Sequence, residues 1–241
     1  MEIFTIFFNT ILYQPLFNVL ILFYEYLPGK DFGVAIIALT FLVKILLYPL
    51  GFKATILQKS LNELQPKIKE IQEKYKGNRQ KQAMETIALY RAENVNPFTG
   101  FFVSLIQIPI LIALFWVSWG GFSPEKLANL YNFVPNPGLI NPFFLGVLNL
   151  SQPSGFLAIL AGISQFLQTK MITPKIAKDS AGKPRLKTPD FSQMMQKQML
   201  YLFPIFTIFI LLKLPSAVGL YWLATSVFSI VQQYFILKKY A

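Results

Sequence analysis

One lysine, Lys44, is the residue best placed to do chemistry in this chain. It lies in the middle of an otherwise uncharged apolar run, 32–52, and no acidic residue falls in any apolar stretch of the sequence. A lysine at the centre of a membrane helix costs roughly 2.5–3.5 kcal/mol on insertion scales, so such a residue usually faces the protein interior or water and has a function. The chemistry open to it is charge pairing with an anion, and the sequence offers no counter-ion in the same environment.

Covalent catalysis and metal binding are not expected. The 241 residues include no cysteine and no histidine, which removes disulfides, thiolate nucleophiles and the usual transition-metal ligands. Neither a GxxxxGK[ST] nor a GxGxxG nucleotide-binding motif occurs. We therefore expect no catalytic residue, no metal site, no cofactor and no enzymatic activity.

Polar residues recur at helical spacing in the same apolar stretches. Thr40, Lys44 and Tyr48 are spaced i, i+4, i+8, which puts them on one helix face. Three further stripes consist of Gly100, Ser104 and Gln107, of Ala161, Gln165 and Gln168, and of Tyr221, Thr225, Ser229 and Gln232, with Gln233 beside the last. Such stripes can be hydrogen bonds that hold helices together. An ammonium without a partner does not fit a dry bundle, so we favour a hydrated cavity shared by the helices.

The elements that must position these residues are membrane spans. Hydrophobic residues make up 54% of the chain and charged residues 14%, against about 25% charged in typical soluble domains. The uncharged apolar stretches predict five spans, over 32–52, 97–122, 154–169, 198–212 and 214–237. The third and fourth are shorter than the ~20 residues that cross a bilayer, so we expect the bilayer to be thinner around them.

The N-terminal segment 1–31 is expected to lie outside the cytoplasm and to carry an interfacial helix over 15–27. Tyr13, Tyr24 and Tyr26 are typical of the membrane interface. A sixth span is the alternative.

Basic residues set the orientation. The segment 51–96 holds nine Lys and Arg, the segment 170–197 holds seven, and the tail adds Lys238 and Lys239. With five spans these segments share one side of the membrane, which the positive-inside rule makes the cytoplasm. We therefore expect the N-terminus outside and the C-terminus inside.

The cytoplasmic segment 53–96 is predicted to form an antiparallel helical hairpin. Its first helix has an apolar seam of residues four and three apart, Leu57, Leu61, Leu64, Ile68, Ile71 and Tyr75. A second helix over 80–91 would pack through Ala83, Ile87 and Tyr90. The hairpin is either simply solvated or contacts lipid head groups, a nascent chain or ribosomal RNA. The other cytoplasmic segment, 170–197, is expected to be a basic loop.

Several motifs follow one another in a fixed order. They are GVAIIALTFLVKILLYPL from residue 33, LQPKIKEIQEKY, LYRAENVNPFTG followed by LIQIPILIALFW, and KQMLYLFPIFTIF with LPSAVGLYWLATSVFSIVQQYFI. Over about residues 12–238 the chain resembles the YidC/Oxa/Alb family of membrane protein insertases. The resemblance implies an all-α integral membrane core, 32–241, with five transmembrane helices around a hydrophilic groove, and a compact bacterial type without a large extracytoplasmic domain.

The resemblance also implies a substrate-binding groove. Lys44 falls where most members carry arginine, which keeps the positive charge but loses the planar guanidinium. Ile108 and Leu111 match apolar positions that face the substrate, and Tyr221 with Trp222 matches an aromatic pair. The full set of expected groove residues is Lys44, Thr40, Gln107, Ile108, Leu111, Gln165, Tyr221, Trp222, Thr225 and Gln232.

The function that follows is a membrane protein insertase and chaperone. It would move hydrophobic segments with short hydrophilic flanks from the cytoplasm into the bilayer, with Lys44 attracting an acidic flank. The alternative is a small-solute or ion transporter that uses Lys44 as its binding charge. Coupled transporters usually need intramembrane carboxylates or paired repeats, and the chain has no such carboxylate.

The expected partners are nascent or newly made membrane proteins and the lipid bilayer. The ribosome and a Sec-type translocon are further candidates, and we expect no specific nucleic acid and a monomer. The expected location is the bacterial plasma (inner) membrane, as a multi-pass protein.

Overall fold

The computed structural model describes residues 6–96, 99–118, 127–173 and 198–240, and for residues 99–107, 118 and 199 it describes the backbone only. Within these ranges the chain is mostly helical, which fits the predicted all-α membrane class. The α-helices are α2 (Gln14–Tyr26), α3 (Phe32–Leu46), α4 (Tyr48–Lys74), α5 (Arg79–Ala92), α6 (Thr99–Ser118), α8 (Gly155–Ile172), α10 (Phe203–Leu211) and α11 (Ser216–Tyr240). Two π-helical turns, η1 (Asn9–Tyr13) and η2 (Gln198–Leu202), precede α2 and α10, and two short antiparallel strands are β1 (Phe143–Phe144) and β2 (Leu148–Asn149).

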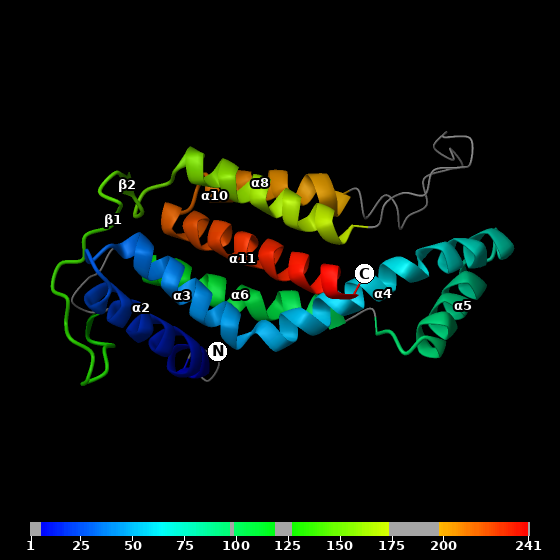
Figure 1. The fold of residues 1–241 in the computed structure, drawn as a ribbon, viewed down its shortest axis with the longest axis horizontal. Helices are drawn as coiled ribbons and strands as arrows, with labels where there is room; N and C mark the ends of the chain where they lie inside the picture. Colours follow the sequence, from blue (N-terminus) through cyan, green and yellow to red (C-terminus); the bar gives the residue numbers. More distant parts are fainter. Residues whose placement is uncertain (1–5, 97–98, 119–126, 174–197, 241) are drawn as a thin grey trace.

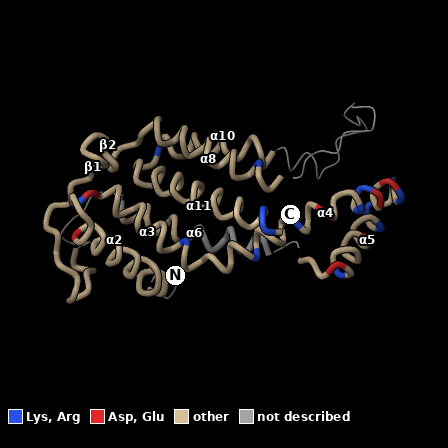
Figure 2. Tube along the Cα trace, viewed as in Figure 1, with Lys and Arg blue, Asp and Glu red and all other residues tan. Residues whose placement is uncertain are grey.

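The helices lie side by side as an elongated bundle (Figure 1). The α4–α5 pair extends from one end, called the hairpin end below, and β1 and β2 lie at the other, called the loop end. The main core lies between α2, α3, α6 and α11, with Phe17, Leu20, Phe32 and Ile36 among its fully buried side chains. Charged residues gather on the α4–α5 pair and near the ends of the bundle (Figure 2), as expected when the middle of a bundle lies in lipid.

Three helices in the described ranges are long and apolar enough to cross a membrane: Ile6–Tyr26, Gly155–Ile172 and Ser216–Tyr240. The pair Phe32–Leu46 and Tyr48–Lys74 passes the same test as one bent unit. Shorter apolar helices, Ile108–Val117 and Leu200–Leu211, lie in α6 and in the η2–α10 segment. Several spans are therefore present, and the count of five stays a prediction.

The predicted span 32–52 is not one straight helix. α3 ends at Leu46, and the chain bends by 67° before α4 begins at Tyr48. Pro49 lies in the first turn of α4, where a missing N–H costs nothing, but its ring opposes continuation of the preceding helix. The first helix of the hairpin therefore begins inside the predicted span.

The N-terminal helix forms where it was expected, but its tyrosines do not all mark an interface. The helix is continuous over Ile6–Tyr26, which makes the sixth span a real alternative. Tyr13 and Tyr24 are buried in the core and only Tyr26 is exposed. Tyr13 and Tyr24 therefore pack inside the bundle, where α2 runs along α3, and of the three tyrosines only Tyr26 is available to the membrane interface. The interfacial position of the helix stays a prediction.

The helical hairpin is present as α4 and α5, but α5 has a different rotation from the one expected. Ala83 and Ile87 are exposed rather than packed on α4. The contacts come from Gln82, which donates to the Gln72 carbonyl at 2.9 Å, and from Glu85, which accepts from the Tyr75 hydroxyl at 3.3 Å. The predicted packing is therefore wrong for Ala83 and Ile87, whereas Tyr90 is partly buried. Most of the predicted loop 170–197 lies outside the described residues.

Candidate functional site

Lys44 is bound to α11 by one neutral contact. Its ammonium Nζ donates to the hydroxyl oxygen of Ser229 at 3.0 Å, and the side chain is half-buried. The ion pairs in the described part of the chain involve Lys30, Lys59 and Lys67, and none of them includes Lys44. Within the described residues the cation therefore has a hydroxyl partner and no carboxylate.

The contact with Ser229 also fixes the depth of the cation. Lys44 lies in the last turn of α3, which by itself would place it near a helix end. Ser229 lies about 20 Å from one end of α11 and about 16 Å from the other, at 1.5 Å per residue. The ammonium is therefore level with the middle of α11. Lys44 is nevertheless in the last turn of α3, because α3 ends at the bend that precedes α4.

Three buried oxygen atoms near this level lack a hydrogen-bond partner among the described residues: Oε1 of Gln165, Oγ1 of Thr225 and Oε1 of Gln233. Thr225, Ser229 and Gln233 are spaced i, i+4, i+8 on α11, and Gln165 lies on the neighbouring α8. Buried polar atoms in proteins are nearly always paired with protein or with water. We call Lys44, Gln165, Thr225, Ser229 and Gln233 the polar seam, which combines one cation with neutral hydrogen-bonding side chains.

Two predicted groove residues do not join the polar seam. Thr40 is 1% exposed, and its hydroxyl donates to the Ile36 carbonyl at 2.7 Å, so its hydrogen bond is made within its own helix. Gln232 points to the α3–α4 bend, where its amide donates to the Tyr48 carbonyl at 3.2 Å. An added Cβ on Gly51 would lie 3.0 Å from this amide, which leaves little free space around it.

The apolar groove residues fall into an accessible and a buried group. Ile108 is 49% exposed, and Leu111 is partly buried between the two core clusters. Tyr221 is 2% exposed and belongs to the main core, and Trp222 packs against the second cluster. The side chain of Gln107 lies outside the described residues. Ile108 is therefore accessible to a bound segment, whereas Tyr221 is not.

Ser229 and Gln233 were missing from the predicted groove set. Both already stood in or beside the polar stripe of this helix, and the spacing of 225, 229 and 233 forms a more regular face than one that includes 232. Choosing between two adjacent glutamines required the rotation of α11, which its neighbours determine.

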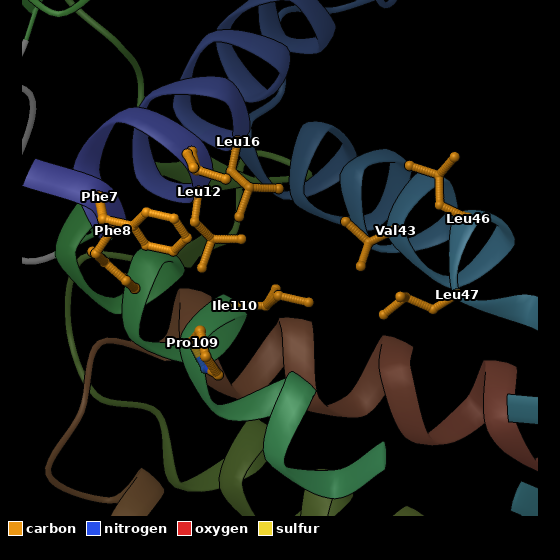
Figure 3. A pocket seen from close by; sticks show the side chains of 10 residues that line it. Phe7, Phe8, Leu12, Leu16, Val43, Leu46, Leu47, Pro109 and Ile110 are labelled. Carbon is orange, nitrogen blue, oxygen red and sulfur yellow. The ribbon is translucent and has the colours of Figure 1, made fainter. Parts of the chain in front are cut away.

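A separate apolar pocket of about 460 Å³ opens between η1, α3 and α6 (Figure 3). Its lining is apolar throughout: Phe7, Phe8, Ile11, Leu12, Leu16, Val43, Leu46, Leu47, Pro109 and Ile110. None of the predicted groove residues is among them. The pocket suits hydrocarbon and offers nothing to an ion or a polar solute.

The chain matches a known family over most of its length. The family model described as 60Kd inner membrane protein matches residues 22–241. A membrane protein insertase YidC from Fusobacterium nucleatum is 36% identical over 87% of this chain and 87% of that protein. Proteins of the same name from Syntrophobacter fumaroxidans and Wolinella succinogenes are 36% and 34% identical over 94% and 96% of this chain. The chain spans only 38% of the length of each of these last two. By sequence and by its apolar helices, the chain belongs to the YidC family of inner membrane proteins.

Proposed function

We propose that this protein is a membrane protein insertase and chaperone that receives clients at the polar seam. Its relatives carry the insertase name, and members of the family are not enzymes. The observation that carries the proposal is the Lys44 ammonium, held by a neutral hydroxyl at 3.0 Å beside buried oxygens that have no hydrogen-bond partner in the described part of the chain. A cation in such a place is suited to an anion that arrives and leaves.

The anion in this proposal is a carboxylate on the short hydrophilic flank of a client segment. Opposite charges attract more strongly in a partly buried, low-dielectric site than in water. The polar seam would hydrate the rest of the flank, while the apolar part of the client moves past exposed side chains such as Ile108 into lipid. The energy would come from burial of the client in lipid and from the membrane potential.

The topology and partners belong to the same proposal. As a family member the protein is a multi-pass protein of the bacterial inner membrane. Five spans, an outside N-terminus and a cytoplasmic α4–α5 hairpin place the basic segments on the cytoplasmic side. Clients and lipid are the partners that the function requires. The ribosome and a Sec-type translocon are candidate partners, and a monomer is the proposed state.

Insertion into liposomes tests the function. The full chain is reconstituted as wild type, Lys44→Ala or Lys44→Arg. The rate at which a single-span client with an acidic flank inserts is then measured for each. We expect Lys44→Ala to slow insertion at least tenfold, which corresponds to about 1.4 kcal/mol, and Lys44→Arg to retain most activity because it keeps the charge. Lys213→Ala is the matched control, because Lys213 is exposed just beyond α10 and outside the polar seam.

Two results separate the parts of the proposal. If wild type inserts no client, the insertase function is wrong. If wild type inserts the client and Lys44→Ala does so equally fast, the function stands and the electrostatic role of Lys44 is wrong. A client whose flank carboxylates are replaced by amides should be insensitive to Lys44→Ala.

A further inference from the structure

Large apolar side chains are exposed at the loop end of the bundle. Leu139 is 97% exposed, Val147 84%, Phe133 72% and Leu145 68%. All four belong to the segment 127–154, called the outer cap below, which joins α6 to α8 and contains β1 and β2 (Figure 1). Apolar side chains clustered at this exposure are unfavourable in water and usually mark an interaction surface.

The outer cap also lacks the charges that are typical of a loop in water. No Asp, Glu, Lys or Arg occurs anywhere in residues 127–169. Figure 2 shows the described part of this loop without a charged residue, although charged residues lie close to it at the ends of α2 and α3. Water-exposed segments are normally rich in charged residues. The composition therefore favours an environment of lower polarity than bulk water.

Backbone donors of the outer cap are bonded within the protein. The Oδ1 atoms of Asn136, Asn141 and Asn149 each accept from the backbone N–H two residues later, at 3.0–3.1 Å. Asn18 of α2 accepts from the Tyr131 N–H at 2.7 Å, and the Tyr24 hydroxyl accepts from the Asn141 N–H at 3.0 Å. A backbone that enters a low-dielectric region needs such partners, because water is scarce there.

At the tip of the β1–β2 hairpin, a leucine has an exposed side chain and a backbone conformation that is unfavourable for it. Leu145 has φ of 52° and is followed by Gly146 with φ of 70°. Turns in which both central residues have positive φ normally carry Asn, Asp or Gly there. A leucine at the first central position is strained, so other contacts must stabilise it. The Asp31 carboxylate supplies it by accepting the Leu145 N–H at 2.5 Å, and Phe144 packs against Gly33.

We propose that the outer cap docks into the head-group and acyl boundary of the surrounding bilayer, with Leu139, Leu145 and Val147 in contact with lipid. The occupant is phospholipid of the adjacent leaflet. The lipid surface is continuous with this patch, because α8 follows the outer cap directly and exposes an apolar row, Phe156, Ile159, Ile163 and Leu167. This inference concerns the bilayer alone and does not depend on insertase activity.

Site-directed fluorescence tests the docking directly, because the chain has no native cysteine to replace. Leu139→Cys, Leu145→Cys and Val147→Cys are labelled with an environment-sensitive dye in the full chain, in liposomes of phosphatidylcholine and phosphatidylglycerol that contain no other protein. Asn78→Cys, in the exposed turn between α4 and α5, is the aqueous reference. Phe156→Cys, 67% exposed on α8, is the lipid reference.

We expect blue-shifted emission at the three outer-cap positions and iodide quenching several-fold weaker than at Asn78→Cys. Lipids with a shallow spin label should quench all three more strongly than lipids with a deep one. Iodide quenching equal to that of the aqueous reference overturns the proposal. Protection that occurs only in native membranes also overturns it, because the occupant would then be a protein. Leu139→Cys lies outside the hairpin tip, so it decides the outcome if substitution at the tip alters the turn.

Discussion

Gly162 is the position where a single methyl group tests the packing most directly. It lies on the buried face of α8, where an added Cβ would fall 2.4 Å from Cγ1 and 2.6 Å from Cδ1 of Ile208 on α10. The Pro204 carbonyl oxygen would lie at 3.2 Å. Distances this short require a shift of one helix or of the isoleucine. Gly162→Ala should therefore displace Ile208 or move α8 away from α10.

The magnitude follows from two opposing effects. Overpacking a closed contact costs about 1–3 kcal/mol, whereas alanine is favoured over glycine inside a helix by about 0.5–1 kcal/mol. Gly162→Ala should therefore destabilise the protein by about 0.5–2 kcal/mol. Gly219→Ala is the matched control, because an added Cβ there would lie 3.5 Å from Leu157, an ordinary contact, so only the helix preference remains.

The assay is reversible unfolding in mixed micelles with increasing SDS, followed by circular dichroism. The free energy of unfolding should be lower for Gly162→Ala than for Gly219→Ala by roughly 1–3 kcal/mol. Adding Ile208→Ala removes both clashing carbon atoms, so Gly162→Ala should cost little in that background. If Gly162→Ala is as stable as Gly219→Ala, the close approach of α8 and α10 is refuted.

Three further predictions concern the site and its supports. Ser229→Ala removes the polar contact that Lys44 makes among the described residues, so insertion of an acidic client should slow several-fold, with no further loss in a Lys44→Ala background. Equal losses in both backgrounds would contradict a role through Lys44. Asp31→Ala removes the N-cap of α3 and should lower the free energy of unfolding by about 1–2 kcal/mol in SDS titrations. Asp31→Asn should restore only part of this loss, because its amide keeps the cap oxygen but cannot also accept from the Leu145 N–H. Gln232→Ala frees the Tyr48 carbonyl at the α3–α4 bend, so electron paramagnetic resonance distances between the bundle and the hairpin should broaden, and unchanged distances would exclude this contact as a brace.

Much of the architecture could be predicted from local pattern. Apolar runs and helical spacing predicted the helices, and the seam on α4 predicted the hairpin, in which Leu64 and Ile68 are indeed buried. Lys44 was identified by the contrast between its charge and its neighbours, and ordered motifs identified the family. These features depend on residues close in sequence or on matched spacing, so no tertiary contact was needed to find them.

Helix rotation and the ends of helices were not predictable in the same way. Lys44 and Tyr48 belong to one apolar run, but they lie on two different helices, α3 and α4, with a bend of 67° between them. On α11, Gln233 is buried whereas Gln232 turns to the bend, and adjacent identical residues give no local signal for that choice. Packing against neighbouring helices sets the rotation of α11 and so decides which glutamine is buried.

The sequence by itself therefore determined that this protein is a helical membrane protein of the YidC family with one unusual cation at its centre. Only the tertiary structure decided what surrounds that cation. It gave Lys44 a hydroxyl partner on α11, satisfied Thr40 within its own helix, and left oxygens of Gln165 and Thr225 buried without a partner among the described residues. The physical reason is that charge and hydropathy are properties of each residue, whereas hydrogen-bond satisfaction depends on which helices meet and at what rotation.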